Sequence, residues 1–231
     1  MNRNIMEKHD GADDNSRIHP GMFITFEGID GSGKSTQIQL LAEHFRNKGF
    51  SVTETREPGG TPSGEKIRNI LLDRNNSISD AAEMLLYAAS RAQLVRDVIR
   101  PALQDGEIVL CDRFLDSSIA YQAYGRGLGS QVEMVNRPAV DGCVPDLTFL
   151  LDLPVRTGKI RASETGEPDR LESEEDAFFR RVREGYLAIA EECPSRVKVI
   201  DAELSIEEIQ TQILSLTEQK WEELSGRKAA E

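Results

Sequence analysis

The sequence carries few cations for its length. Its 231 residues include 28 Lys and Arg against 40 Asp and Glu, which gives a net charge of -12 at pH 7. A broad nucleic-acid surface needs clustered excess Lys and Arg to displace counterions, so this composition argues against nucleic acid as a partner. We expect any polyanion that the protein binds to be small and held at one local site.

The sequence also has few cysteines and no long apolar run. Cys111, Cys143 and Cys193 show no C-x-x-C spacing and no accompanying histidine cluster, and an odd number argues against a disulfide framework. No apolar stretch approaches the ~20 residues of a membrane span, and no basic-then-apolar secretory start is present. We therefore expect a cytoplasmic protein with reduced thiols and no membrane association.

Domain organisation follows from the length and from the polarity of the two ends. A 39% share of hydrophobic residues is enough for the core of one α/β domain. Residues 1–21 are polar and show no period, which predicts a flexible N-terminal extension. Residues 218–231 are expected to form a charged C-terminal tail. The folded domain should then span residues 22–217.

Apolar runs and helical periodicity alternate through that domain. Short apolar runs predict strands at residues 23–26, 50–55, 107–114, 146–153 and 196–202. Apolar residues at helical spacing predict helices at residues 37–45, 64–72, 80–103, 131–141, 174–192 and 205–223, of which 80–103 is the longest. Continuous apolar strands between helices are typical of a parallel sheet covered on both faces. The pattern predicts an α/β fold with a five-stranded parallel sheet flanked by helices.

The turn after the first strand carries a phosphate-binding motif. Gly28, Gly33, Lys34 and Ser35 fit G-x-x-x-x-G-K-[ST] between a strand and a helix, which predicts a P-loop NTPase fold. Glycines let successive backbone N–H groups point at phosphate oxygens, and the following helix adds the positive end of its dipole. Lys34 should contact the β- and γ-phosphates, and the Ser35 hydroxyl should bind Mg²⁺. The predicted ATP-binding residues are Gly28, Ile29, Asp30, Gly31, Ser32, Gly33, Lys34, Ser35 and Thr36.

A second feature lies at the end of the strand predicted at 107–114. Asp112 ends its apolar run, where a carboxylate of the Walker B type reaches Mg²⁺. Arg113 follows at once, and its planar guanidinium suits a second phosphate. A surface ion pair is the alternative for these two residues. A phosphate loop alone does not distinguish a kinase from a motor or a switch.

Six segments taken together resemble thymidylate kinases, which phosphorylate dTMP with ATP. The segments are GIDGSGKST, TREPGGT, LLYAASRAQL, DRFLDSSIAYQ, PDLTFLLDLP and DRLE. The resemblance covers residues 23 to about 216 and implies that residues 22–217 form a nucleoside monophosphate kinase domain. It further implies transfer of the ATP γ-phosphoryl group to dTMP with Mg²⁺ as cofactor, giving dTDP and ADP, and a homodimer formed through the long helices.

The resemblance implies roles at the sugar and phosphate of the acceptor. Asp30 would meet the 3′-hydroxyl, although a carboxylate in a turn can also simply stabilise that turn. Arg56 and Arg113 would hold the acceptor phosphate, and Glu57 would lie near Mg²⁺ or the phosphates. A solvated ion pair is the alternative for Arg56 and Glu57.

Further roles are implied at the base. Tyr87 would stack on thymine, where the family usually has Phe, and Arg91 one helical turn later would donate to a base oxygen. Core packing is the alternative for Tyr87. Ser118 would lie at the base edge with Gln122 nearby, and Tyr121 would occupy the space of a ribose 2′-hydroxyl.

The segment at about 158–172 resembles the mobile lid that brings arginine to the transferring phosphoryl group. Many bacterial members of the family have arginines at its centre, whereas this chain has Ser163, Glu164 and Thr165. We infer that Arg161 and Arg170 jointly act with Lys34 and Arg113 as the catalytic cations. A solvated charged loop is the alternative for the lid cations.

Three other functions remain open on the sequence. A kinase of UMP or CMP would share the fold, although Tyr87, Arg91 and Tyr121 favour a deoxythymidine pocket. A P-loop switch or ATPase would not need a second phosphate site at Arg56 and Arg113. An inactive paralogue would account for the missing lid arginines.

Overall fold

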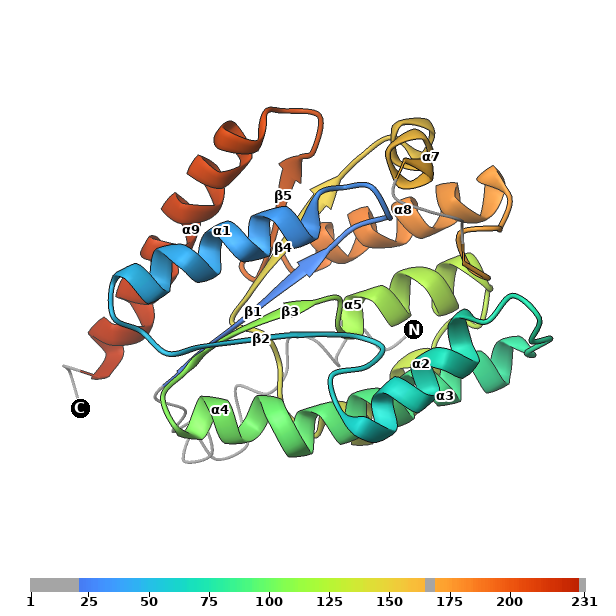
Figure 1. Ribbon diagram of the computed structural model, residues 1–231, viewed down its shortest axis with the longest axis horizontal. Helices are drawn as coiled ribbons and strands as arrows, with labels where there is room; N and C mark the ends of the chain where they lie inside the picture. The colour runs from blue at the N-terminus through green and yellow to red at the C-terminus, as the bar shows by residue number, and fades with distance from the viewer. Residues whose placement is uncertain (1–20, 165–168, 229–231) are drawn as a thin grey trace.

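The computed structural model describes residues 21–164 and 169–228 (Figure 1). Apart from Gly21, the predicted N-terminal extension lies outside these ranges, as do residues 165–168 at the centre of the predicted lid. Within them, no helix is both long and apolar enough to cross a bilayer. Cys111, Cys143 and Cys193 all lie within these ranges as buried thiols that form no disulfide, as predicted.

The five predicted strands are confirmed and form one parallel sheet. They are β1 (Met22–Glu27), β2 (Val52–Arg56), β3 (Ile108–Asp112), β4 (Leu147–Asp152) and β5 (Val197–Asp201). Their order is β2-β3-β1-β4-β5. Asp112 pairs in register with both Phe26 and Arg56, so three strands end at one edge. β1 lies between β3 and β4, and the chain leaves β1 at this edge. The connections to the strands on its two sides run in opposite directions there, and parallel sheets form a ligand crevice at such a point.

Several of the helices that connect the strands extend beyond their predicted bounds. Their bounds are α1 (Lys34–Asn47), α2 (Pro62–Leu72), α3 (Asp80–Leu94), η1 (Val95–Ile99), α4 (Arg100–Gln104), α5 (Leu115–Ser118), η2 (Ile119–Gly125), α6 (Gln131–Val140), α7 (Val155–Ser163), α8 (Asp176–Glu192) and α9 (Ile206–Lys228). The helix predicted over 80–103 is an unbroken run through α3, η1 and α4, in which η1 is a π-helical turn. α9 continues to Lys228, past its predicted end at residue 223.

Local capping explains where α2 and α3 begin. Thr61 accepts a hydrogen bond from the Gly64 amide at 3.0 Å, and Pro62 occupies the first helical position, where its missing N–H costs nothing. Helix α2 therefore begins two residues before the predicted Gly64. Ser79 accepts from the Ala82 amide at 3.3 Å, so it is the N-cap of α3.

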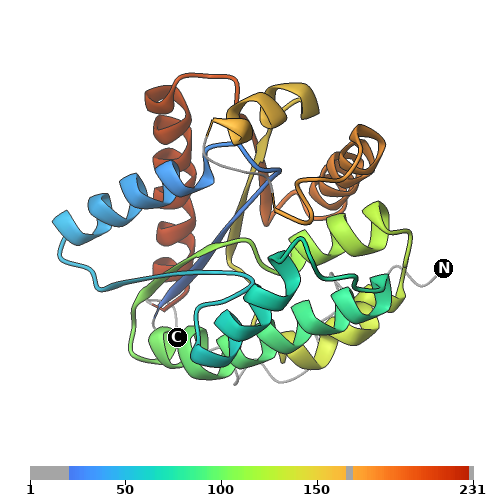
Figure 2. The same cartoon turned by 45° about the vertical axis from the view of Figure 1, so that its right-hand side comes forward.

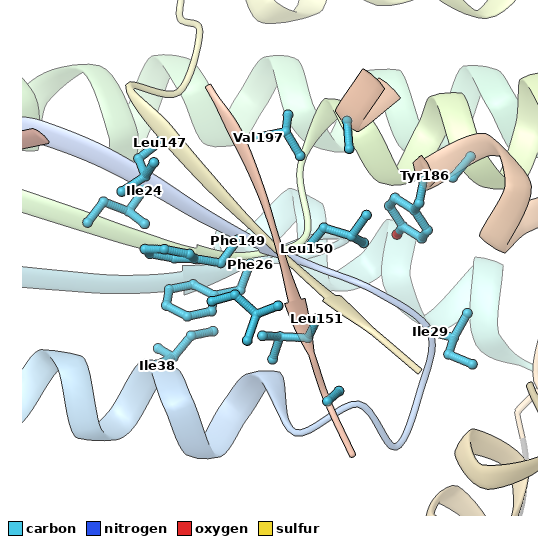
Figure 3. Close-up of a cluster of buried hydrophobic side chains, with 14 of the residues drawn as sticks. Ile24, Phe26, Ile29, Ile38, Leu147, Phe149, Leu150, Leu151, Tyr186 and Val197 are labelled. Carbon is cyan, nitrogen blue, oxygen red and sulfur yellow. The ribbon is translucent and has the colours of Figure 1, made fainter. Parts of the chain in front are cut away.

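Two layers of helices bury the sheet. Helices α1 and α9 pack against one face, and the α3–α4 run lies on the other side (Figure 1). Ile24 and Phe26 pack among Ile38 of α1 and Phe149 of β4 (Figure 3). Fully burying one such side chain contributes about 1.5–3 kcal/mol relative to leaving it exposed. The packing makes the sheet a rigid support for the loops at its carboxyl edge.

Candidate active site

The phosphate loop connects β1 to α1 and requires glycine at several positions. Gly28, Gly31 and Gly33 have φ angles of 135°, 79° and 90°, in the region that favours glycine. A Cβ on Gly28 would lie 2.5 Å from the Leu151 carbonyl oxygen, and one on Gly31 would lie 2.5 Å from that of Gly158. Figure 2 shows α7, which contains Gly158, beside this loop. The loop is therefore fixed between β4 and α7.

Lys34 lies at the start of α1, over the loop. Its Nζ donates to the carbonyl oxygens of Gly28 and Ile29, both at 3.1 Å. Burial lowers the pKa of Lys34, and the neighbouring charge of Arg113 lowers it further. The ammonium group is thus held at the phosphate loop by two of its carbonyl oxygens.

Ser35 and Asp112 meet across the same edge of the sheet. The Ser35 Oγ lies 3.4 Å from Oδ2 of Asp112. The other carboxylate oxygen, Oδ1, is buried and has no hydrogen-bond partner in the part of the chain that the structure describes. Mg²⁺ is commonly bound by one or two protein oxygens together with substrate phosphates and water. The pair fits that role, and no cluster of three or more His, Cys, Asp or Glu residues able to hold a metal occurs in the described ranges.

A pocket of about 510 Å³, partly open to solvent, lies beside the phosphate loop. Six of the predicted substrate-binding residues line it, whereas Arg56 and Arg91 are not among its lining residues. The full lining is Asp30, Glu57, Pro58, Arg68, Leu72, Tyr87, Arg113, Ser117, Ser118, Tyr121, Gln122, Asp169 and Leu171. The Tyr121 hydroxyl is buried and has no hydrogen-bond partner among the described residues. A ligand in the pocket would therefore meet aromatic rings, hydroxyls, carboxylates and two arginines, Arg68 and Arg113.

Arg113 connects the pocket to the phosphate loop. Its guanidinium donates to Oδ1 of Asp30 at 2.6 Å and to the Gly28 carbonyl oxygen at 2.9 Å. It also lies 5.2 Å from the centre of the Tyr121 ring. Burial opposes the ionised form of Asp30, but Arg113 and then Lys34 outweigh it and lower the Asp30 pKa. Both groups of this pair are therefore charged.

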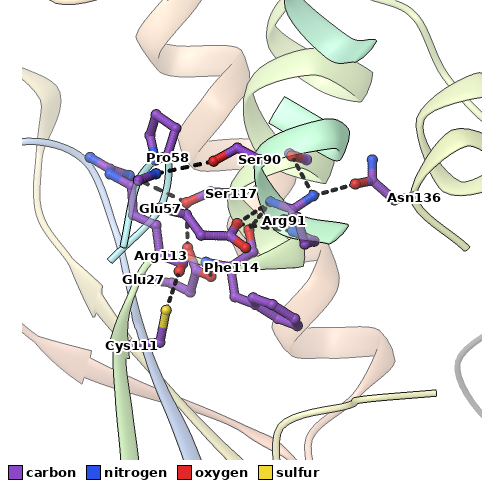
Figure 4. Close-up of polar contacts among 12 residues, drawn as sticks. Glu27, Glu57, Pro58, Ser90, Arg91, Cys111, Arg113, Phe114, Ser117 and Asn136 are labelled. Atoms are coloured by element: carbon purple, nitrogen blue, oxygen red, sulfur yellow. Dashed lines mark hydrogen bonds and ion pairs between the residues drawn. The ribbon is translucent and has the colours of Figure 1, made fainter. Parts of the chain in front are cut away.

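Glu27 holds the segment after Arg113 (Figure 4). This buried carboxyl at the end of β1 accepts from the Phe114 amide at 2.8 Å, from Ser117 Oγ at 2.5 Å and from the Tyr186 hydroxyl at 3.1 Å. Burial raises the Glu27 pKa to about 7, and the charge of Asp116 acts in the same direction. Arg113 itself has a φ of 67°, a conformation that its neighbours must maintain.

Arg91 is fully buried and serves several segments (Figure 4). Its Nε and Nη2 donate to Oε2 of Glu57 at 2.9 and 2.5 Å, and Nη2 also donates to the Phe114 carbonyl oxygen at 2.9 Å. Its Nη1 donates to Ser118 Oγ at 3.0 Å and to Oδ1 of Asn136. These contacts use all five N–H donors of a guanidinium. One of these partners, Ser118, lines the pocket beside the phosphate loop.

The neighbouring residues Glu57 and Arg56 make different contacts. Glu57, expected near Mg²⁺ or the phosphates, lines the pocket and pairs through one carboxylate oxygen with Arg91, and burial raises its pKa to about 7 although Arg91 opposes that change. Arg56 was expected at the acceptor phosphate, but it pairs with Glu65 at 3.0 Å and its side chain is 52% exposed. The cation that α2 contributes to the pocket lining is Arg68, which donates to the Pro58 carbonyl oxygen at 2.9 Å.

The two lid arginines occupy different places. Arg161 on α7 adjoins the phosphate loop, because a Cβ built on Gly31 would lie 3.0 Å from the Arg161 Cβ. The Nη1 of Arg161 donates to the Ala202 carbonyl oxygen at 2.9 Å. Arg170 instead donates to Oε2 of Glu83 at 2.6 Å and to the Leu71 carbonyl oxygen at 2.7 Å. The structure therefore separates the two cations that the sequence analysis grouped together.

Several lining residues were not predicted. Asp169 and Leu171 belong to DRLE, one of the segments that carry the resemblance, and Ser117 belongs to another, DRFLDSSIAYQ. The resemblance therefore pointed to these segments but assigned no role to the three side chains. Arg68 lies on α2, shortly after TREPGGT, and only the position of that helix over the pocket reveals it.

A phosphate loop, a Ser–Asp pair at the sheet edge and a second pocket joined to them define a P-loop NTPase fold. The thymidylate kinase family model matches residues 26–213. A thymidylate kinase of Halothermothrix orenii is 54% identical over 197 residues, covering 84% of this chain and 94% of that protein. One from Exiguobacterium is 51% identical over 85% of this chain and 94% of that protein. The chain belongs to the thymidylate kinase family.

A solved structure agrees with this assignment. The thymidylate kinase of Ehrlichia chaffeensis superimposes with a TM-score of 0.70 at 37% sequence identity. The match covers 86% of this chain and 98% of that one. The agreement therefore extends over nearly the whole fold described above.

Proposed function

We propose that this protein transfers the γ-phosphoryl group of ATP to dTMP, forming dTDP and ADP. The observation that carries this proposal is the contact between Asp30 and Arg113 at 2.6 Å, because it joins the phosphate loop to the neighbouring pocket. A donor cradle and an acceptor pocket that share a wall are what transfer between two nucleotides requires. A switch or ATPase would have no use for the second pocket.

Phosphate chemistry is assigned to the residues at the sheet edge. Lys34 would neutralise the β- and γ-phosphates, and Arg113 would contact the acceptor phosphate. Ser35 and Asp112 would hold Mg²⁺, which when bound neutralises charge on the donor phosphates. The acceptor oxygen is already anionic, so no general base is needed and positioning with charge neutralisation suffices.

Acceptor recognition is assigned to the pocket. Tyr87 would stack on the base, Ser118 and Gln122 would meet its polar edge, and Asp30 would accept from the 3′-hydroxyl. Tyr121 would fill the space of a 2′-hydroxyl and so favour deoxyribonucleotides. The remaining cation near the phosphate loop, Arg161, is proposed to complete the transfer site from α7.

A homodimer and a cytoplasmic location complete the proposal. Helices α3 and α6 pack together and leave Leu85 and Met134 exposed by 55% and 62%, so this face is proposed to contact a second copy. Sedimentation velocity should give a dimer, and Met134→Glu should shift the population toward monomer. ATP and dTMP as substrates suit the cytoplasm.

The deciding experiment is ADP formation from Mg-ATP with dTMP, dUMP, UMP, CMP and dCMP. Lys34→Met should reduce turnover of dTMP by at least about a thousandfold, because the transition-state charge loses its principal cation. Lys198→Met is the matched control, since Lys198 donates to the Pro194 carbonyl oxygen far from the site. Transfer to none of the five acceptors, despite ATP binding, would overturn the proposal. A preference for UMP or CMP would mean that this nucleotide, and not dTMP, is the phosphoryl acceptor.

A further inference from the structure

A buried ion pair fixes α5 to the sheet. Arg196, the residue before β5, donates from Nη1 to Oδ2 of Asp116 at 2.6 Å and from Nη2 to Oδ1 at 2.9 Å. The side chains of Asp116 and Arg196 are exposed by only 4% and 13%. The backbone of Arg196 belongs to the sheet, because its carbonyl oxygen accepts from the Thr148 amide of β4 at 2.9 Å. Asp116 lies on α5, which closely follows Arg113 in the chain.

Burial makes this ion pair costly. It opposes the charged form of Arg196, but the charge of Asp116 outweighs it and raises the Arg196 pKa. Removing two charges from water costs free energy that their attraction only roughly offsets, and apolar side chains of similar size often stabilise a fold as well or better. The pair is therefore better explained by the geometry that it imposes on α5 than by added stability.

The helix α5 is too short to fix its own position. It has four residues, and Phe114 at its N-cap makes no side-chain capping bond, whereas an isolated helix of even roughly 12–15 residues is only marginally stable in water. Consecutive side chains of α5 instead bind three separate elements of the fold: Asp116 at Arg196, Ser117 at Glu27 and Ser118 at Arg91. Asp116 is the one of these three that does not line the pocket.

Ser117 is the residue through which α5 reaches Arg113 (Figure 4). Its Oγ donates to Oε2 of Glu27 at 2.5 Å and lies 2.7 Å from the Tyr186 hydroxyl oxygen. Nη1 of Arg113 donates to Ser117 Oγ at 3.4 Å and to the Tyr186 hydroxyl at 3.2 Å. Because Ser117 gives its hydrogen to Glu27, its lone pairs remain for Arg113. The contact with Arg113 is already long, so a small displacement of α5 would break it.

Resting on the proposed function, we propose that Asp116 and Arg196 are positioning residues for acceptor binding. Their ion pair holds α5 so that Ser117 orients the Arg113 guanidinium toward the acceptor phosphate. Both act at a distance, since neither lines the pocket. Loss of the pair should therefore weaken acceptor binding and leave ATP binding nearly unchanged.

The test replaces both charges together. In Asp116→Leu/Arg196→Met neither charge is left unpaired. The Thr148 hydroxyl, which accepts from Arg196 Nη1 at 2.8 Å, keeps the Thr25 hydroxyl as a partner at 2.7 Å. The urea midpoint of this double variant should therefore equal or exceed that of wild type. Arg196→Met alone should lower the midpoint, because it leaves the Asp116 carboxylate buried without its partner.

Acceptor binding should not recover with stability. Calorimetry should give a dissociation constant for dTMP about tenfold higher in the double variant, the effect of losing one hydrogen bond of the guanidinium. Ser117→Ala should weaken dTMP binding similarly, and adding it to the double variant should cause little further loss, because the contact that the pair positions is already gone. Arg46→Met/Glu54→Leu, which removes a surface pair at 2.7 Å, is the matched control and should leave dTMP binding unchanged.

The outcomes distinguish this inference from the proposed function. A stable double variant that binds dTMP as tightly as wild type would overturn the inference, and so would full additivity with Ser117→Ala. If the double variant fails to fold, Arg196→Lys decides. Lysine keeps the charge but cannot bond both Asp116 oxygens in the geometry of the fork, so unchanged dTMP binding in that variant would also overturn the inference.

The wild-type protein separates the remaining cases. If it binds dTMP without phosphoryl transfer, the proposed function is overturned and the binding comparison still decides the inference. If it binds none of dTMP, dUMP, UMP, CMP and dCMP, both are overturned, because no acceptor site exists for the pair to position.

Discussion

Nη2 of Arg113 donates a hydrogen bond to Oδ1 of Asp30 at 2.6 Å, although the two residues lie 83 positions apart in the chain. Asp30 belongs to the phosphate loop, whereas Arg113 directly follows β3 and lines the neighbouring pocket. Its backbone φ of 67° is uncommon for arginine. The fold thus maintains an unfavourable backbone conformation at the point where the phosphate loop and the pocket meet.

Arg113→Lys should lower kcat/KM for dTMP by about a hundredfold or more. Lysine keeps the charge but cannot reach Asp30, the Gly28 carbonyl oxygen and a phosphate together, so at least two charge-assisted hydrogen bonds are lost. Steady-state kinetics with varied dTMP measure the effect, and Arg46→Lys on α1 is the control. A loss confined to the KM for ATP would contradict the assignment to the acceptor side.

Asp112→Asn should raise the Mg²⁺ concentration needed for half-maximal rate by about 10–100-fold. The amide keeps the shape but removes the charge from the two oxygens, Oδ2 beside Ser35 and the buried Oδ1. Rates are measured against Mg²⁺ at fixed ATP and dTMP, and chelation should abolish turnover until Mg²⁺ is restored. The same Mg²⁺ dependence in mutant and wild type would remove Asp112 from the metal site.

Glu27→Gln should change how stability depends on pH. Burial raises the Glu27 pKa from 4.5 to about 7, so the folded state binds a proton that the unfolded state has released between these values. The stabilising contribution is present below pH 4.5 and is lost as pH rises through 7.

Urea unfolding at pH 5 and pH 8 tests this prediction. Relative to Glu27→Gln, wild type should lose at most about 3 kcal/mol in free energy of unfolding between the two values. A parallel pH dependence of the two proteins would show that Glu27 stays charged throughout.

Gly158→Ala should weaken both stability and ATP binding. A Cβ there would lie 2.6 Å from Cδ1 of Ile29 and 2.9 Å from the Asp30 carbonyl oxygen, so α7 and the phosphate loop would have to separate. We expect a loss of about 1–3 kcal/mol in the free energy of unfolding and a raised KM for ATP. Gly226→Ala on α9 meets nothing within 4 Å and should be neutral or stabilising. Equal effects at both glycines would contradict the contact.

The strands and the phosphate loop could be predicted because their signals are local. Phe23 to Phe26 reads as a buried strand, and Gly28 to Ser35 carries its motif within eight positions. The predicted start of α2 was two residues too late, because Thr61 and Pro62 mark the beginning of the helix by capping and not by apolar spacing. The π-helical turn at 95–99 leaves no mark in the apolar spacing.

The pocket could be predicted only in part, since side chains distant in sequence assemble it. Arg91 was assigned to the base by resemblance, but its partners Glu57 and Asn136 lie 34 and 45 positions away. Glu83 gave no signal, because its contact with Arg170 spans 87 positions. Nothing local to either residue indicates that they meet.

The contacts of Glu83 and of Arg113 fall on different elements. Glu83 connects α3, η2 and residues 169–174, whereas Arg113 connects the phosphate loop and the segment after β3. Side chains around Glu83 can therefore be replaced during evolution without disturbing the contacts of Arg113. Divergence toward another base, or its laboratory evolution, would be concentrated in residues 83–87, 118–126 and 169–174, while the residues proposed to bind phosphate stay constant.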